Sequence, residues 1–161
     1  MNKKVRFITQ SAAIAALYIV LTVFISAFGL ASGVIQIRIS EALCILPYFS
    51  LSAVPGLFIG CLVSNLITGC ALWDVVFGSI ATLLGAISTY LLRNKSKYFA
   101  PIGPIISNAV IIPFVLINVY GTKDAWWFLF STVGIGEIIS CGILGIILLN
   151  IIEKNKKLIF K

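Results

Sequence analysis

The chain has 161 residues, of which 60% are hydrophobic and only 11% are charged, and its mean hydropathy is +1.12. A soluble domain is roughly half apolar, so this composition excludes a water-soluble globular protein. The net charge of +7 would suggest nucleic-acid binding in a soluble protein. Here most basic residues lie between or beyond apolar segments, so we interpret them as topology signals and expect no nucleic-acid partner.

The apolar segments predict an all-α integral membrane protein with six transmembrane helices in one domain, residues 1–161. A spanning helix needs about 20 largely apolar residues, so six helices fit only with short connections. The second helix is too short to cross alone, and we expect the segment just before it to dip into the protein. The breaks between apolar runs place the helices at about 7–28, 40–51, 55–68, 72–92, 101–119 and 126–152.

The basic residues predict the orientation of this bundle in the bacterial plasma membrane. Ten of the twelve lie in the N-terminus, the loop at 93–97 and the C-terminal tail, which leaves Arg38 and Lys123 on the opposite side. Basic residues accumulate on the cytoplasmic side, so both termini are expected to be cytoplasmic. The three tryptophans, Trp73, Trp126 and Trp127, then fall at the outer ends of their helices, where interfacial aromatic residues concentrate.

No catalytic motif accompanies this architecture. The sequence has no histidine and no GxxxxGK[ST], HExxH or GxSxG pattern. Its four cysteines, at positions 44, 61, 70 and 141, lie in apolar segments without CxxC spacing, and we interpret them as buried small side chains. We therefore expect a protein that is not an enzyme and needs no metal or cofactor.

Ionisable residues within the apolar segments are functional candidates, because burying a charge in a membrane is costly. Arg38 and Glu41 flank the start of the second helix and could form a structural ion pair. Asp74 lies in the first turn of its helix, so it could have the purely structural role of stabilising the helix dipole. Glu137 has no cation nearby in sequence and is the strongest candidate for contact with a solute. Asn65, late in the third helix, is expected at a similar depth in the membrane to these ionisable residues.

Small residues recur at a spacing that lets helix backbones approach closely: Ala12-x3-Ala16, Gly56-x3-Gly60 and Ala81-x3-Gly85. Packing within the bundle explains such pairs, but Ala12 and Ala16 could also dock another membrane subunit. Asn108 and Asn118 in the fifth helix are interpreted as interhelical hydrogen-bond formers.

Four segments together resemble the QueT family of substrate-binding subunits: residues 35–43 (IQIRISEAL), 55–65 (PGLFIGCLVSN), 74–82 (DVVFGSIAT) and 134–137 (GIGE). Members of this family are S components of energy-coupling factor transporters and are assigned to queuosine precursors. The resemblance covers essentially the whole chain. It implies a six-helix S-component bundle that captures a solute from outside.

The resemblance also implies partners. An S component works with a module of one transmembrane coupling subunit and two cytoplasmic ATPases, which agrees with the missing nucleotide-binding motif. In S components a small-residue face of the first helix meets the coupling subunit, and Ala12-x3-Ala16 matches that pattern. The loop after the first helix commonly covers the solute.

The implied solute is a 7-deazaguanine, such as 7-aminomethyl-7-deazaguanine or its nitrile precursor. Glu137 or Glu41 would accept the adjacent N–H groups of its ring edge, and Asp74 would bind the aminomethyl cation. Asn65 would read the ring carbonyl, and Trp73 would stack on the ring. An S component for another vitamin, a stand-alone carrier or channel, and a membrane-embedded hydrolase are the alternatives.

Overall fold

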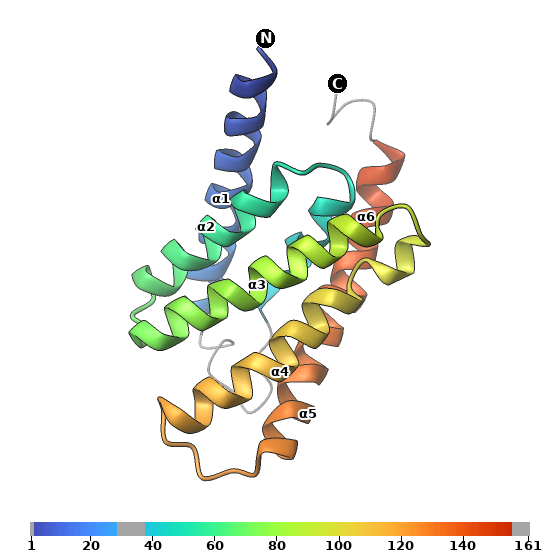
Figure 1. Ribbon diagram of the computed structural model, residues 1–161. Coiled ribbons are helices and arrows are strands. Elements are labelled where there is room, and N and C mark those ends of the chain that lie inside the picture. The colour runs from blue at the N-terminus through green and yellow to red at the C-terminus, as the bar shows by residue number, and fades with distance from the viewer. Residues whose placement is uncertain (1, 29–37, 156–161) are drawn as a thin grey trace.

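A computed structural model describes residues 2–28 and 38–155, and every regular element in these ranges is helical. The segment expected to dip into the protein before the second helix lies mostly outside the described residues. Six α-helices, with three 3₁₀ or π-helical segments interspersed among them, make up the described part of the chain (Figure 1). The elements are α1 (Lys3–Ala27), η1 (Ile39–Tyr48), α2 (Ala53–Ile67), α3 (Leu72–Leu92), η2 (Lys97–Phe99), α4 (Ile102–Asn118), α5 (Trp126–Glu137), η3 (Ile138–Leu144) and α6 (Gly145–Lys154).

Long apolar runs predicted the helix positions well. The prediction for α3 matches at both ends, and α1 starts four residues before its predicted start because the Asn2 side chain accepts a hydrogen bond from the Lys4 backbone N–H. In two of the predicted helices the backbone is not α-helical throughout. The predicted second helix is a 3₁₀ helix, η1, which includes Pro47. The predicted last helix is α5 and α6 joined by seven residues of π-helix, η3.

The short 3₁₀ helix η1 occupies the centre of the bundle. Residues 40–47 are all buried. It packs against α1, α3, η3 and α6, while the longer helices pack mainly on their neighbours in sequence. The hydrophobic core accordingly includes Cys44, Ile45 and Leu46 of η1 together with Leu57 of α2 and Leu149 of α6.

Small residues set the spacing of the outer helices. A Cβ atom at Gly60 of α2 would lie 2.8 Å from Tyr18 Cβ of α1, and one at Gly85 of α3 would lie 2.7 Å from the Pro104 Cα of α4. These helices approach too closely for any larger residue. Packing within the bundle is thus the role of Gly60 and Gly85.

For Ala12 and Ala16 the packing interpretation is wrong. Both side chains are exposed on α1, while Ser11, Ala15 and Tyr18 form the face of α1 that is buried against the bundle. The reason is helical phase, because residues 11, 15 and 18 share one face and residues 12 and 16 lie about 100° around the helix from it.

The protein is an all-α membrane protein. Four helical stretches are long and apolar enough to cross a membrane, at 3–27, 72–92, 97–118 and 126–154, and two shorter apolar helices lie at 39–48 and 53–67. Many large apolar side chains are exposed on their outer faces, among them Val20, Leu84 and Ile147. Such a surface suits lipid rather than water.

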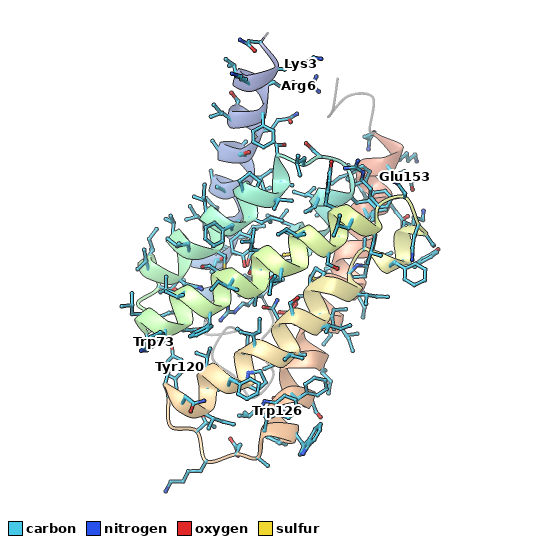
Figure 2. The ribbon with its side chains drawn as sticks, viewed as in Figure 1. Lys3, Arg6, Trp73, Tyr120, Trp126 and Glu153 are labelled. Atoms are coloured by element: carbon cyan, nitrogen blue, oxygen red, sulfur yellow. The ribbon has the colours of Figure 1, made fainter. Side chains whose placement is uncertain are left out.

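The two ends of the bundle differ in composition. The start of α1, the end of α6 and the connection between α3 and α4 lie at one end, whereas the α2–α3 and α4–α5 connections lie at the other (Figure 1). Lys3, Arg6 and Glu153 mark the first end, and Trp73, Tyr120 and Trp126 lie toward the second (Figure 2).

Candidate functional site

A buried carboxyl group stands at the centre of the bundle. Glu41 lies in the first turn of η1 and is only 2% exposed. The Tyr18 hydroxyl donates a hydrogen bond to its Oε1, and the Cys44 thiol lies 2.9 Å from its Oε2 and donates to it. Both carboxyl oxygens therefore have partners from the protein itself. Among the described residues no ion pair joins Glu41 to Arg38, so the alternative interpretation of these two residues as a structural ion pair is not supported.

Thiols surround this carboxyl group. The Cys141 Sγ of η3 donates to the Glu41 backbone carbonyl at 2.9 Å, and the Thr82 hydroxyl lies 3.4 Å from the Cys61 Sγ. Cys44, Cys61 and Cys141 are buried as expected, whereas Cys70 is partly exposed.

Glu41, Cys44 and Cys141 could in principle hold a metal ion, because their ligand atoms lie within 4.8 Å of one another. Thiolate, not thiol, binds metal. Here both thiols lie in position to donate hydrogen bonds to Glu41, an arrangement that suits their protonated form.

A polar cavity of about 160 Å³ opens between the second half of α1, the end of α2 and the start of η1. Two of the predicted site residues, Arg38 and Asn65, line it. Hydroxyl groups complete the wall, and the Thr22 hydroxyl donates to the Ser40 hydroxyl at 2.8 Å. The cavity is lined by Thr22, Ile25, Ser26, Arg38, Ser40, Asn65, Thr68 and Cys70.

Asp74 lies close to Asn65 at the start of α3. The Asn65 Nδ2 and the Asp74 Oδ1 would lie 3.2 and 3.6 Å from a Cβ atom at Gly78, so the missing side chain at Gly78 leaves room for both. The Tyr120 hydroxyl donates to the Asp74 Oδ2 at 3.0 Å. The pKa of Tyr120 is raised, mainly by partial burial of the side chain. The hydroxyl therefore keeps its proton at neutral pH.

Glu137, the last residue of α5, is the acid without a complete set of partners. It is 8% exposed, and its Oε2 has no hydrogen-bond partner. Asn108 of α4 and Cys141 of η3 lie beside it. An unpaired acceptor in a membrane interior costs free energy, so this atom is the first place to look for a bound group.

Trp73 lies apart from the polar residues. It is 60% exposed and stacks on Phe77, with 5.8 Å between the ring centroids. Both residues line an apolar groove of about 590 Å³ between α3 and α4. The groove and the polar cavity share no lining residue, so the predicted stacking of Trp73 on a ligand in that cavity is not supported by its position.

The structure thus brings Arg38, Asn65 and Asp74 together at one place and leaves Glu41 and Glu137 deeper, near Cys141. Sequence analysis missed Tyr18, the main partner of Glu41. Its signal was present, because Ser11, Tyr18 and Thr22 recur on one face of an otherwise apolar helix.

We expect Tyr18→Phe to destabilise the protein, because it leaves the buried Glu41 Oε1 without the hydroxyl donor. Such a loss costs about 1–3 kcal/mol, which lowers the melting temperature by about 2–4 °C per kcal/mol in a chain of this size. Thermal unfolding of the purified protein in detergent measures this effect. Tyr98→Phe, at an exposed tyrosine, is the matched control. Equal melting of the two variants would show that the Tyr18–Glu41 bond contributes nothing.

Comparison with known proteins identifies the family. The family model described as QueT transporter matches residues 8–154. The queuosine precursor transporter QueT of Lactococcus lactis subsp. cremoris (strain MG1363) is 35% identical over 95 residues, which make up 57% of this chain and 55% of the relative. The match therefore spans about half the relative's length. No solved structure matches the chain. Because the family model covers nearly all of it, the chain belongs to the QueT transporter family.

Proposed function

We propose that this member of the QueT transporter family is the substrate-binding subunit of an energy-coupling factor importer. Its solute is a queuosine precursor, a 7-deazaguanine such as 7-aminomethyl-7-deazaguanine, which it captures from outside the cell. The observation that carries the proposal is the family match over residues 8–154, and the name of the bacterial relative supports the choice of solute.

Glu137 is the residue that we assign to the ring edge of the solute. A guanine-like ring presents adjacent N–H donors, which one carboxylate accepts as a pair. Glu41 suits this role less well, because Tyr18 and Cys44 already occupy both of its oxygens. Glu137 has an unpartnered oxygen at similar burial.

Asp74, Asn65 and Arg38 form the second part of the proposed site. Asp74 would bind the aminomethyl cation, and Asn65 is an amide on the wall of the polar cavity. The Tyr120 hydroxyl occupies only one Asp74 oxygen, which leaves Oδ1 for the ligand. Trp73 is not retained as a stacking residue, because it lines the apolar groove instead.

We further propose six membrane crossings with both termini in the cytoplasm. The crossings are α1, η1, α2, α3, α4 and the continuous run α5–η3–α6. In support, the start of α1, whose sequence includes Lys3, Lys4 and Arg6, lies at the same end of the bundle as the α3–α4 connection, whose sequence includes Arg93 and Lys95 (Figure 1). Basic residues favour the cytoplasmic side.

Labelling of whole cells with a membrane-impermeant maleimide tests this orientation. In a Cys70→Ser background, which removes the one partly exposed native cysteine, Lys123→Cys should react and Lys95→Cys should be protected. Both positions are exposed on the protein, so the membrane alone decides the outcome. Reaction at Lys95→Cys from outside would contradict the proposed topology.

The energising module is proposed to dock on α1. Only 17% of the apolar window of α1 is buried, against 39% or more in the other three long helical stretches. Ala12 and Ala16 lie on its exposed side, where small side chains allow another helix to come close. The absence of a nucleotide-binding motif from the sequence fits energy supplied by partner ATPases.

We expect Ala16→Trp to abolish solute uptake by cells and to leave solute binding by the purified subunit within about twofold of the parent. A large side chain would hold a partner helix away without touching the core. Leu17→Trp is the control, since Leu17 is also exposed but lies about 100° around α1. If Ala16→Trp removed binding as well, Ala16 would belong to the subunit's own structure rather than to a docking face.

Calorimetry with 7-aminomethyl-7-deazaguanine tests the proposed solute. Glu137→Gln should weaken its binding by about 1.5–3 kcal/mol, the scale of one hydrogen bond to a charged group, which is roughly tenfold or more in dissociation constant. The empty variant should melt no lower than the parent, because the cost of a buried carboxylate disappears.

Glu153→Gln is the matched control, because Glu153 lies at the other end of the last helical run and pairs with Lys97 at 2.9 Å. It should leave binding unchanged. A parent protein that binds no 7-deazaguanine would refute the proposed solute. Unchanged binding by Glu137→Gln would refute only the role of Glu137.

A further inference from the structure

Two hydroxyl groups of α1 line the polar cavity together with Arg38 and Asn65. They belong to Thr22 and Ser26, which are four residues apart and therefore share one face of the helix. Both side chains are partly exposed, whereas Tyr18, one turn before Thr22, is only 1% exposed. A polar group in the interior of a membrane protein is costly unless another polar group faces it. The α1 side of the cavity is thus suited to a polar ligand rather than to lipid.

The cavity lies where a solute from outside the cell would arrive. Its walls come from the last turns of α1, the end of α2 and the start of η1. The end of α2 leads into the α2–α3 connection, which lies at the end of the bundle opposite to the start of α1 (Figure 1). In the proposed orientation this is the outer end. Because about 10–15 Å³ suffices for one water molecule, a cavity of about 160 Å³ has room for a small ring.

The Ser26 hydroxyl has no bond to the protein that a ligand would have to replace. A serine within a helix often donates to the backbone carbonyl four residues before it, which here belongs to Thr22. Ser26 does not do so, and its side chain forms no hydrogen bond with any other residue in 2–28 and 38–155. Its proton and its lone pairs are therefore both available to a ligand in the cavity.

The Thr22 hydroxyl is held in place by the protein and offers an acceptor. Its Oγ1 lies 2.9 Å from the Tyr18 backbone carbonyl and 2.8 Å from the Ser40 hydroxyl, and it can donate to either. Each of these bonds uses its single proton and leaves a lone pair of Oγ1 for a ligand. Ser40 is fully buried, so Thr22 is the member of this hydroxyl pair that a ligand can contact.

We propose that Thr22 and Ser26 are further solute-binding residues, which form a hydroxyl wall on α1 in the cavity that Arg38 and Asn65 also line. This inference rests on the proposed function and extends its site to α1. Thr22 accepts a hydrogen bond from an N–H group of the solute, and Ser26 bonds to a second polar group. One side of α1 then contacts the solute, while its exposed side carries the docking face proposed for the energising module.

Calorimetry and thermal unfolding of the purified full chain test the two residues separately. Ser26→Ala should weaken binding of 7-aminomethyl-7-deazaguanine about three- to tenfold, the effect of one lost hydrogen bond. The empty variant should melt at the temperature of the parent, because Ser26 has no described protein partner to lose. Thr22→Val should weaken binding by a similar factor and also lower the melting temperature, because Ser40 loses its partner. Thr22→Ser keeps the hydroxyl and should bind like the parent.

Ser11→Ala is the matched control on the buried face of the same helix. Ser11 donates to the Ser52 carbonyl at 2.8 Å and does not line the cavity. It precedes Thr22 by eleven residues, which is roughly 16 Å along the helix. This variant should melt lower than the parent and bind the solute equally well.

Three outcomes would contradict the inference. Unchanged affinity in both Ser26→Ala and Thr22→Val would overturn it and leave the proposed function standing. An equal loss of affinity in Ser11→Ala would overturn it as well, because the effect would then reflect general stability. A parent protein that does not bind the deazaguanine would overturn both proposals.

Discussion

The bundle is organised around the buried carboxyl group of Glu41. Its side chain accepts hydrogen bonds from Tyr18 of α1 and Cys44 of η1, and its backbone carbonyl accepts one from Cys141 of η3. Water cannot satisfy a polar group in the interior of a membrane protein, so the protein must supply these partners itself. The requirement fixes the positions of α1 and η3 around η1, although Tyr18 and Cys141 lie more than a hundred residues apart.

Two unusual helical geometries meet at this centre. A 3₁₀ helix rises about 2.0 Å per residue instead of 1.5 Å, so the ten residues of η1 extend as far as about thirteen α-helical residues would. This extension lets a short segment cross much of the bundle. The π-helical segment η3 packs against it and carries Cys141. Single π-helical turns inside α-helices often occur at functional sites, and this one begins directly after Glu137.

The positions of the helices could be predicted from the length of the apolar runs in the sequence. The helical geometry of η1 and η3 and the contacts of the buried acids could not. The positions of α3 and α4 follow from apolar runs bounded by Gly, Pro or charged residues, and they match the structure closely. The 3₁₀ form of η1 and the π-helical form of η3, two segments that pack against each other, were not predicted from the apolar runs. For the candidate site, the sequence identified Glu41 and Glu137 because both are ionisable residues within apolar segments. Only the contacts distinguish a carboxyl group with two protein partners from one with a free oxygen.

This distinction between the two acids assigns them opposite energetic roles. Glu41 has its partners in the empty protein, so it contributes to the fold whether or not a solute is present. Glu137 retains an unpaired oxygen there, which costs about 1–3 kcal/mol. On the proposed function, a solute that donates a hydrogen bond to this oxygen removes that cost. On that proposal the unpaired oxygen makes the empty site less favourable, and part of the affinity for the solute comes from removing this cost. Binding to the folded state alone also stabilises the protein, by about 2.7 kcal/mol at a hundred times the dissociation constant.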